Sequence, residues 1–318
     1  MTETVYGMFF TAGETPKCDR IQYFDMELGY SMASAYPRDK AAGDAVTELL
    51  SRVETAHEAG FDYIQAGDHH AMVDSNYFQN VPLLGRISSI FDRVASLFLI
   101  PLYHPVLLAE YCGTIDSLCQ DFELWCAVGW RSEEFEALNV PVTERAPRLE
   151  EGLSMLKALW EDDEVSYEGT YHSLDDVTIN PKASPKRTVI GGIAEPAVRR
   201  AGRKGDGWIA SPVESIADLK RKREWFEAGG GGEMLVRRDA LVLKDGAAAD
   251  EMATEILESG YRGWEADAPI LAGGIEDVVA DLRALADLGV KDVVVRPMED
   301  EHATETLRVL GEARDRAF

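Results

Sequence analysis

Short apolar runs alternate along this chain with longer stretches in which apolar residues recur every three or four positions. The first pair shows both periods: residues 5–10 form an apolar run, and residues 46–56 carry a helical stripe that Gly60 closes. Similar strand-like runs are expected at residues 63–66, 94–100, 123–128, 188–193, 208–210, 240–243 and 292–295. Eight such strand–helix units indicate a parallel sheet, and eight is the number that closes a (β/α)8 TIM barrel.

Two segments interrupt this repeat, and both predict insertions in a single domain of residues 1–318. Residues 11–40 form a long connection after the first strand, and its Tyr and Met side chains favour a lid or a substrate wall. Residues 162–186 precede the fifth strand, and their VSYEGTYHSL pattern predicts a small β excursion. A doubly wound open sheet is the alternative. It would need a dinucleotide-binding glycine motif after the first strand, and no G-x-G-x-x-G stands there.

The chain is strongly acidic, which narrows the classes of partner. Lys and Arg total 32 against 57 Asp and Glu, a net charge of −25. We therefore expect no nucleic-acid partner, because phosphate binding needs a basic face. Acidity spread over the whole chain favours a halophilic protein, although an ordinary acidic cytosolic protein stays open. The four cysteines form no C-x-x-C pair, and no run resembles a signal peptide or a membrane span, so we expect a cytoplasmic protein without a membrane partner.

The candidate chemistry begins with Asp68, His69 and His70, which follow the second predicted strand. The carboxyl ends of barrel strands build the active site. One of these histidines is therefore expected to act as an acid/base group or as a hydrogen-bond donor to a bound ring, with Asp68 fixing its tautomer. A capped turn with solvated imidazoles is the alternative. We expect no metal site, because adjacent side chains diverge and no third ligand stands at motif spacing.

A phosphate site is expected where the fifth strand meets its helix, in the stretch IGGIAEPAVRRAG. Glycines let backbone N–H groups approach an anion, and Pro196 opens a helix whose N-terminus favours negative charge. The candidates are Gly191, Gly192, Ile193 and Ala194. Tight strand–helix packing would also need the glycines. Arg148 could add a cation to this site, or it could be a solvated residue at a helix start.

Four motifs stand in the order in which a known family has them. They are acid–His–His after the second strand, IPLYHP after the third, VGWRSEEF after the fourth and IGG at the fifth. With these motifs the chain resembles the luciferase-like monooxygenases of the bacterial luciferase superfamily. The resemblance implies a (β/α)8 barrel that uses either reduced FMN with oxygen or the deazaflavin F420. It also implies that His69 is the active-site histidine near the flavin ring and that His70 is structural.

The resemblance implies further contacts around the flavin and the substrate. The residues expected beside the cofactor are Asp68, Ser96, Leu97 and Gly129. A non-proline cis peptide is expected between Ser96 and Leu97, behind the flavin ring. Phe10 and Trp130 are expected to line the substrate pocket, although Trp130 could merely pack.

These features favour an FMNH2-dependent monooxygenase that acts with O2 on a small organic substrate, with a separate flavin reductase supplying FMNH2. An F420-dependent dehydrogenase or reductase is the alternative, and a non-catalytic flavin-binding barrel is the alternative from another class. FMN is favoured because the mouth segments show few cations for the polyanionic tail of F420. These cations are Lys17, Arg20, Arg131 and Arg148. We also expect a homo-oligomer, a dimer.

Overall fold

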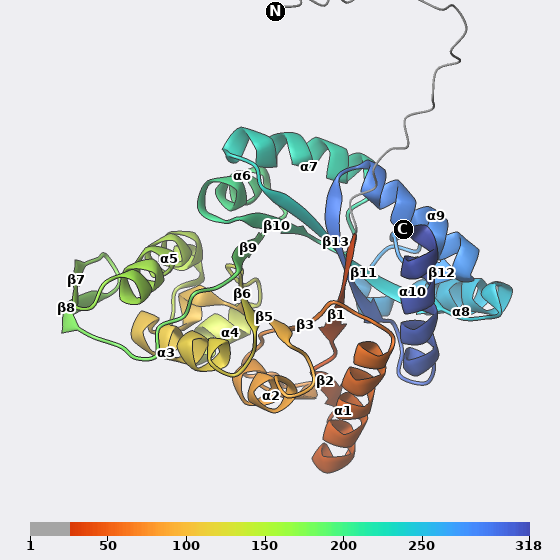
Figure 1. The fold of residues 1–318 in the computed structure, drawn as a ribbon, viewed down its shortest axis with the longest axis horizontal. Helices are drawn as coiled ribbons and strands as arrows, with labels where there is room; N and C mark the ends of the chain where they lie inside the picture. The colour runs from red at the N-terminus through yellow and green to blue at the C-terminus, as the bar shows by residue number, and fades with distance from the viewer. Residues whose placement is uncertain (1–25) are drawn as a thin grey trace, which may run out of the picture.

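The structure is a computed structural model, and it describes residues 26–318. Eight parallel strands form a ring in the order β1, β3, β5, β6, β9, β10, β11 and β13, and β13 pairs with β1. Their bounds are β1 (Glu27–Met32), β3 (Tyr63–Ala66), β5 (Arg93–Phe98), β6 (Asp121–Cys126), β9 (Arg187–Gly191), β10 (Gly207–Ala210), β11 (Glu233–Val242) and β13 (Val290–Pro297). Pairing between β10 and β11 closes the ring, which confirms the predicted (β/α)8 TIM barrel (Figure 1).

Helices surround the barrel on its outside and follow most of the predicted stripes (Figure 1). Their bounds are α1 (Ala42–Glu58), α2 (Asn80–Ile87), α3 (Pro105–Asp116), α4 (Ser132–Ala137), α5 (Arg145–Glu161), α6 (Glu195–Lys204), α7 (Ile216–Gly229), α8 (Gly246–Glu258), α9 (Ile275–Asp287) and α10 (Ala303–Ala317). The sequence did not predict α10, which packs against α1 and α9. No helix within residues 26–318 combines the length and the apolarity needed to cross a bilayer.

The first barrel strand differs from the prediction. Residues 5–10, including Phe10, lie outside the described residues, and β1 (Glu27–Met32) occupies the place between β13 and β3. The segment predicted as an insertion after strand one therefore supplies the first strand of the described barrel and the short β2 (Ala35–Pro37). The pattern hid this strand because its apolar residues form no continuous run. Gly29 interrupts them, and a Cβ at Gly29 would lie 2.5 Å from the Tyr63 ring.

Two short antiparallel sheets extend the barrel. β7 (Val165–Glu168) pairs with β8 (Ser173–Val177), which confirms the β excursion predicted before the fifth strand. β2 pairs with β4 (Ser75–Tyr77), so the loops that follow β1 and β3 are joined. A further short strand, β12 (Leu271–Gly273), pairs with the carboxyl end of β11.

Alternate residues of the strands fill the barrel in layers, as the pleat of each strand requires. The middle layer is apolar and consists of Tyr63, Ala95, Trp125, Val189, Leu235 and Val294. On β11 the charged residues Glu233 and Arg237 stand two positions before and after Leu235, toward the two ends of the barrel. The prediction of residues 240–243 for this strand was therefore too short, because its first half carries charges that an apolar pattern does not register.

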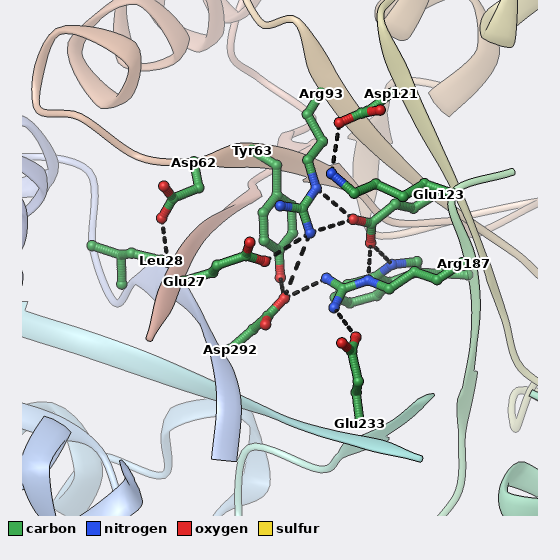
Figure 2. Close-up of polar contacts among 12 residues, drawn as sticks. Glu27, Leu28, Asp62, Tyr63, Arg93, Asp121, Glu123, Arg187, Glu233 and Asp292 are labelled. Atoms are coloured by element: carbon green, nitrogen blue, oxygen red, sulfur yellow. Dashed lines mark hydrogen bonds and ion pairs between the residues drawn. The ribbon is translucent and has the colours of Figure 1, made fainter. Parts of the chain in front are cut away.

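Charged side chains close the amino end of the barrel (Figure 2). Glu123 accepts a hydrogen bond from Nε of Arg93 at 2.5 Å and another from Nε of Arg187 at 2.8 Å. Asp292 accepts a hydrogen bond from the Tyr63 hydroxyl at 3.0 Å and pairs with Arg187. Burial raises the pKa of Asp292 to about 6, against the attraction of Arg187. We call these five residues the basal cluster.

Candidate active site

A cavity of about 310 Å³ opens at the carboxyl ends of the barrel strands. Its lining includes His69, Tyr77, Leu97, Trp130, Arg237 and Arg296. The size falls at the lower end of the range for small-molecule sites, roughly 300–1,000 Å³. Because it opens at the carboxyl ends of the strands, the cavity lies on the face where barrel enzymes have their active sites.

His69 lies in the loop after β3 and leans against a neighbouring aromatic ring. Its imidazole and the Tyr77 ring meet edge to face, with centroids 5.4 Å apart. Its Nδ1 lies 2.8 Å from Oε1 of Glu134, which belongs to α4, and the His69 side chain is 32% exposed. Asp68 was expected to fix the tautomer of one of the two histidines, but the carboxylate that contacts His69 is Glu134 of α4.

Glu134 is fully buried and remains charged. Burial acts to raise the pKa of Glu134, but the hydrogen bond with His69 and another from the backbone N–H of His70 lower it overall. A carboxylate can only accept hydrogen bonds, so Nδ1 of His69 carries the proton. This tautomer leaves the lone pair of Nε2 free, and the His69 ring can accept a proton from a molecule in the cavity.

Asp68 has a different task from the one predicted. Its Oδ2 accepts a hydrogen bond from the backbone N–H of Leu99 at 2.8 Å, and its Oδ1 accepts one from the Tyr103 hydroxyl at 3.0 Å. Its Oδ1 also lies 3.3 Å from Nε2 of His70, at an angle outside hydrogen-bond geometry. Asp68 therefore joins the ends of β3 and β5 and forms part of the cavity wall.

His70 packs inside the wall, in agreement with a structural role. Its ring meets the Tyr103 ring edge to face at 5.5 Å. Burial acts to lower the pKa of His70, but the close polar contact with Asp68 and the charges of Asp68 and Glu134 raise it overall. The imidazole of His70 thus lies beside Asp68, whereas that of His69 lies beside Glu134.

The residues predicted beside the flavin on β5 divide between the two sides of the barrel wall. Leu97 lines the cavity, whereas Ser96 is fully buried and its hydroxyl lies 3.3 Å from Nδ2 of Asn80 on α2. The predicted cis peptide between Ser96 and Leu97 was wrong. In the described residues the cis bond recorded is Asn180–Pro181. β5 keeps a regular register with β6 through Ser96 and Leu97, so the strand carries no bulge at this place.

The turn after β6 places Trp130 at the rim of the cavity. Gly129 adopts φ +78°, in the left-handed region that glycine favours, and a Cβ there would come within 3.0 Å of the Phe135 ring. Trp130 follows it and is 73% exposed, so it lines the mouth and does not pack into the core. Arg131 stands over the Trp130 ring at 5.7 Å and also lines the cavity.

The predicted phosphate loop connects β9 to α6. Ala194 is the N-cap of α6 and has no side-chain capping bond. Pro196 has no N–H and that of Ala197 donates to the carbonyl of Ala194 at 2.9 Å, so in the first turn the N–H of Glu195 is the one that could face an anion. Gly192 also serves packing, because a Cβ there would lie 2.9 Å from that of Ala197. Glu195 pairs with Arg199 at 2.8 Å, which partly neutralises the acid beside the loop.

Arg148 is engaged elsewhere. It pairs with Glu144 at 2.9 Å and stands over the Tyr171 ring at 4.3 Å. Of the two open interpretations of Arg148, the structure favours a residue that is paired at a helix start. The expected phosphate loop, Gly191, Gly192, Ile193 and Ala194, thus does not have Arg148 as a partner.

Three arginines that sequence reasoning missed line the cavity: Arg237 on β11, Arg296 on β13 and Arg262 in the turn after α8. We call these three residues the arginine cluster. Two of them share Asp239, which is fully buried and lies 2.6 Å from Arg237 and 3.4 Å from Arg262. The expectation that the mouth is poor in cations was therefore wrong. Lys17 and Arg20, which entered that expectation, lie outside the described residues.

Comparison with known proteins agrees with the barrel and with the order of the motifs. A family model described as luciferase-like monooxygenase matches residues 26–268. The chain belongs to the luciferase-like monooxygenase family. The resemblance drawn from the four motifs is thereby confirmed.

Several curated relatives of this luciferase-like chain are F420-dependent glucose-6-phosphate dehydrogenases. The one from Nakamurella multipartita is 30% identical over 290 residues, which cover 80% of this chain and 81% of the relative. The one from Microbacterium testaceum is 33% identical over 175 residues, which cover 52% of each chain. The chain thus spans about half the length of some of the curated relatives that it matches.

Solved structures share the luciferase-like fold over nearly their whole length. The monooxygenase RslO1 from Streptomyces bottropensis superposes with a TM-score of 0.77 at 20% identity, over 91% of this chain and 98% of that one. An F420-dependent secondary alcohol dehydrogenase in complex with an F420–acetone adduct gives 0.77 at 16% identity, over 93% and 100%. At these identities the similarity shows the fold.

The site residues that were missed in this luciferase-like barrel have weak signals in the sequence. Glu134 stands inside the VGWRSEEF motif, but its contact with His69 spans 65 residues. Arg237 and Arg296 each end an apolar stretch of a strand, in VRRD and VVVRP. A charge at that point of a barrel strand faces the mouth when it has the parity of the inward residues. Among the described residues, no group of three His, Cys, Asp or Glu side chains is placed to hold a metal ion.

Proposed function

We propose that the protein is an F420-dependent oxidoreductase that moves a hydride between the deazaflavin and a small polar substrate, with His69 as the group that transfers the proton. The observation that carries this proposal is the His69–Glu134 pair, which faces a cavity lined by arginines. The named activity of the relative from Nakamurella multipartita supports the choice of cofactor.

The chemistry of the pair suits the oxidation of an alcohol and its reverse. As a hydride leaves the carbon of an alcohol, the hydroxyl must lose a proton to a base within hydrogen-bond reach. Nε2 of His69 is such a base, since Glu134 holds the proton on Nδ1. The positive charge that develops on the imidazole is stabilised by the buried carboxylate of Glu134. In the reductive direction the same ring returns the proton.

The lining of the cavity favours this reaction over monooxygenation. An oxygenating flavin site must exclude water around its reactive adduct. Here Arg131 and the arginine cluster bring charged groups into the same cavity as His69. These groups suit a hydrated, polar substrate, and for this reason we place F420 before FMN, in contrast to the expectation from the sequence.

The residues present fit a flavin-type cofactor. The uncapped start of α6, with Gly191, Gly192, Ile193 and Ala194, offers backbone N–H groups to a phosphate. Leu97 and Trp130 offer apolar surface in the cavity wall. When bound, F420 supplies a ring carbon that accepts or donates a hydride. The chain itself positions the substrate hydroxyl at His69 and moves the proton.

The test is a parallel titration of the purified protein with F420 and FMN, each oxidised and reduced, at matched KCl. We expect F420 to bind at least about 10-fold more tightly than FMN, a difference of roughly 1.4 kcal/mol. F420 absorbance would then report turnover with a panel of small alcohols and sugar phosphates, glucose 6-phosphate among them. Tight FMN binding without F420 binding, together with oxygen consumption, would replace the proposal with the monooxygenase. Cofactor binding without turnover of any substrate would favour the non-catalytic barrel.

A further inference from the structure

Within residues 26–318, the arginine cluster has fewer carboxylate partners than it has guanidinium groups. Four of the residues that line the cavity are arginines, and one, Asp68, is acidic. The carboxylate of Asp68 already accepts hydrogen bonds from the backbone N–H of Leu99 and the Tyr103 hydroxyl. Asp239 is not among the lining residues. It pairs with Arg237 and Arg262, and it accepts a hydrogen bond from the Tyr261 hydroxyl at 2.8 Å. Within the described part of the chain, Asp239 is therefore the one carboxylate that pairs with this cluster, and it pairs with two of its three arginines.

Two donors of the arginine cluster, and one of Arg131 in the same cavity, have no acceptor within the described residues. Nε of Arg237, Nε of Arg296 and Nε of the adjacent Arg131 are buried and lack a hydrogen-bond partner among the described residues. An unpaired buried donor costs about 1–3 kcal/mol, and more when the group is charged. Burial, together with the charges of Arg237 and Arg262, lowers the pKa of Arg296. An anion between these side chains would remove both costs.

The backbone conformation of Arg262 is of a kind found at ligand-binding sites. Arg262 adopts φ 55° and ψ 16°, in the left-handed region that a non-glycine residue rarely occupies, and it stands between Gly260 at φ 87° and Gly263 at φ 70°. Such conformations persist where the surroundings enforce them, and they cluster at ligand sites. The turn brings Arg262 to Asp239 and to the cavity that Arg237 lines.

We propose that the arginine cluster binds an anionic group of the substrate, a phosphate or a carboxylate, and holds the rest of that molecule against His69. The guanidinium fork matches the paired oxygens of both groups. β13 carries Arg296 and is separated from β3, which leads to His69, by β1 alone. Two strand spacings amount to about 10 Å, the span of a small sugar phosphate or hydroxy acid. The phosphate loop before α6 lies in another sector of the barrel, after β9.

This inference rests on the proposed function for the reaction, but its binding step is tested without cofactor. Calorimetric titration with inorganic phosphate, and separately with acetate, is carried out at constant ionic strength on the wild type, Arg237→Met, Arg296→Met and the control Arg308→Met, an exposed arginine of α10. We expect the two cluster variants to weaken the better-bound anion on the order of 10–100-fold and the control to leave it unchanged. Equal affinities in all four proteins would overturn the inference.

A second measurement guards against variants that merely fold poorly. Because Nε of Arg296 is buried without a hydrogen-bond partner among residues 26–318, Arg296→Met should melt at or above the wild-type temperature without anions and lose the rise in Tm that phosphate or acetate gives the wild type. A variant with a lower Tm that keeps this rise would contradict the inference. F420 affinity reduced on the order of 10-fold in Arg296→Met would also overturn it, because the cluster would then hold the cofactor tail. Should F420 fail to bind the wild type while anion binding still requires Arg296, the proposed function falls and the anion site stands.

Discussion

Glu134 determines what His69 can do, because it selects which ring nitrogen carries the proton. Its carboxylate also accepts the backbone N–H of His70, so one buried acid fixes both the ring and the loop that carries it. Burial alone would make this acid hard to ionise, and the two donors reverse that tendency in its pKa. The reactivity of His69 therefore depends on a residue that does not line the cavity.

Replacement of Glu134 by Gln tests this dependence. The amide can donate to Nδ1, and His69 would then present Nε2–H in place of the free lone pair. We expect kcat to fall on the order of 100-fold, as in His69→Ala, with little change in cofactor affinity. His70→Ala is the control and should be milder; kcat within a few-fold of wild type in Glu134→Gln would exclude the positioning role.

The contact between His70 and Asp68 makes a second prediction, on stability. The pKa of His70 is raised in the folded protein, so the charged ring contributes stability below its unfolded pKa of about 6.5 and loses it as pH rises through the folded pKa. The Tm difference between the wild type and His70→Gln should therefore be larger at about pH 5.5 than at about pH 8.5. The same difference at both pH values would show that Asp68 does not hold the charge of His70.

Site residues that directly follow an apolar strand could be predicted from the sequence. Site residues whose role depends on a contact with a distant part of the chain could not. Asp68 and His69 were found because they directly follow an apolar strand. Glu134 and Arg262 were not, because their role arises from neighbours far away along the chain. The strand arginines depend on parity, and parity cannot be counted until the strand's first residue is known.

At the scale of elements, helices with a clear 3.6-residue stripe were predicted to within a few residues, whereas β1 and α10 were missed. α10 packs closely on the end of α1, and Gly311 makes this approach possible. A Cβ at Gly311 would lie 2.1 Å from the carbonyl oxygen of Ala59. The pattern of apolar residues does not indicate such a contact, because α1 and α10 lie near opposite ends of the chain.

Gly311→Ala should therefore destabilise the fold through overpacking, by about 1–3 kcal/mol. Gly43→Ala in the first turn of α1 is the matched control. A Cβ there meets nothing within 4 Å, and the change should stabilise by roughly 0.5–1 kcal/mol because alanine loses less backbone entropy. Urea unfolding at equilibrium measures both. Equal stability of the two variants would mean that α10 moves away from α1 without cost.

At the scale of the whole molecule, the basal cluster holds the amino ends of several strands together. Both oxygens of Glu123 are occupied, by Arg93 on one side and by Arg187 and the Trp125 indole on the other. Glu123→Gln would leave two buried arginines short of charge and should destabilise by about 3–5 kcal/mol.

Asp292→Asn is the control within the same cluster and should cost much less. Burial already raises the pKa of Asp292 to about 6. The folded state therefore binds this proton more tightly than the unfolded chain, and the contribution of Asp292 to stability falls as pH rises from about 4 through about 6. Relative to Asp292→Asn, the wild type should lose stability over this window in thermal melts. A wild type that gains stability there would reverse the sign of the shift.

The net charge of −25 acts on the molecule as a whole. Its self-repulsion should make Tm rise with KCl from dilute buffer into the molar range, beyond the point at which the Debye length has fallen to about 10 Å. Differential scanning calorimetry over this range tests the halophilic expectation. A Tm that stays flat or falls would leave an ordinary acidic protein.

The apolar middle layer of the barrel separates two charged ends of different sign. The basal cluster and its neighbours Glu27 and Glu233 carry more acids than bases, whereas the mouth carries more bases than acids. The barrel thus has a polarity along its axis, positive at the opening. An anionic ligand is repelled at long range by the net negative charge of the molecule, and it is attracted at short range by the arginines at the mouth. Added salt screens the distant repulsion first, so the encounter rate of an anionic substrate should increase with salt, opposite to the behaviour of an enzyme that draws its substrate in from afar.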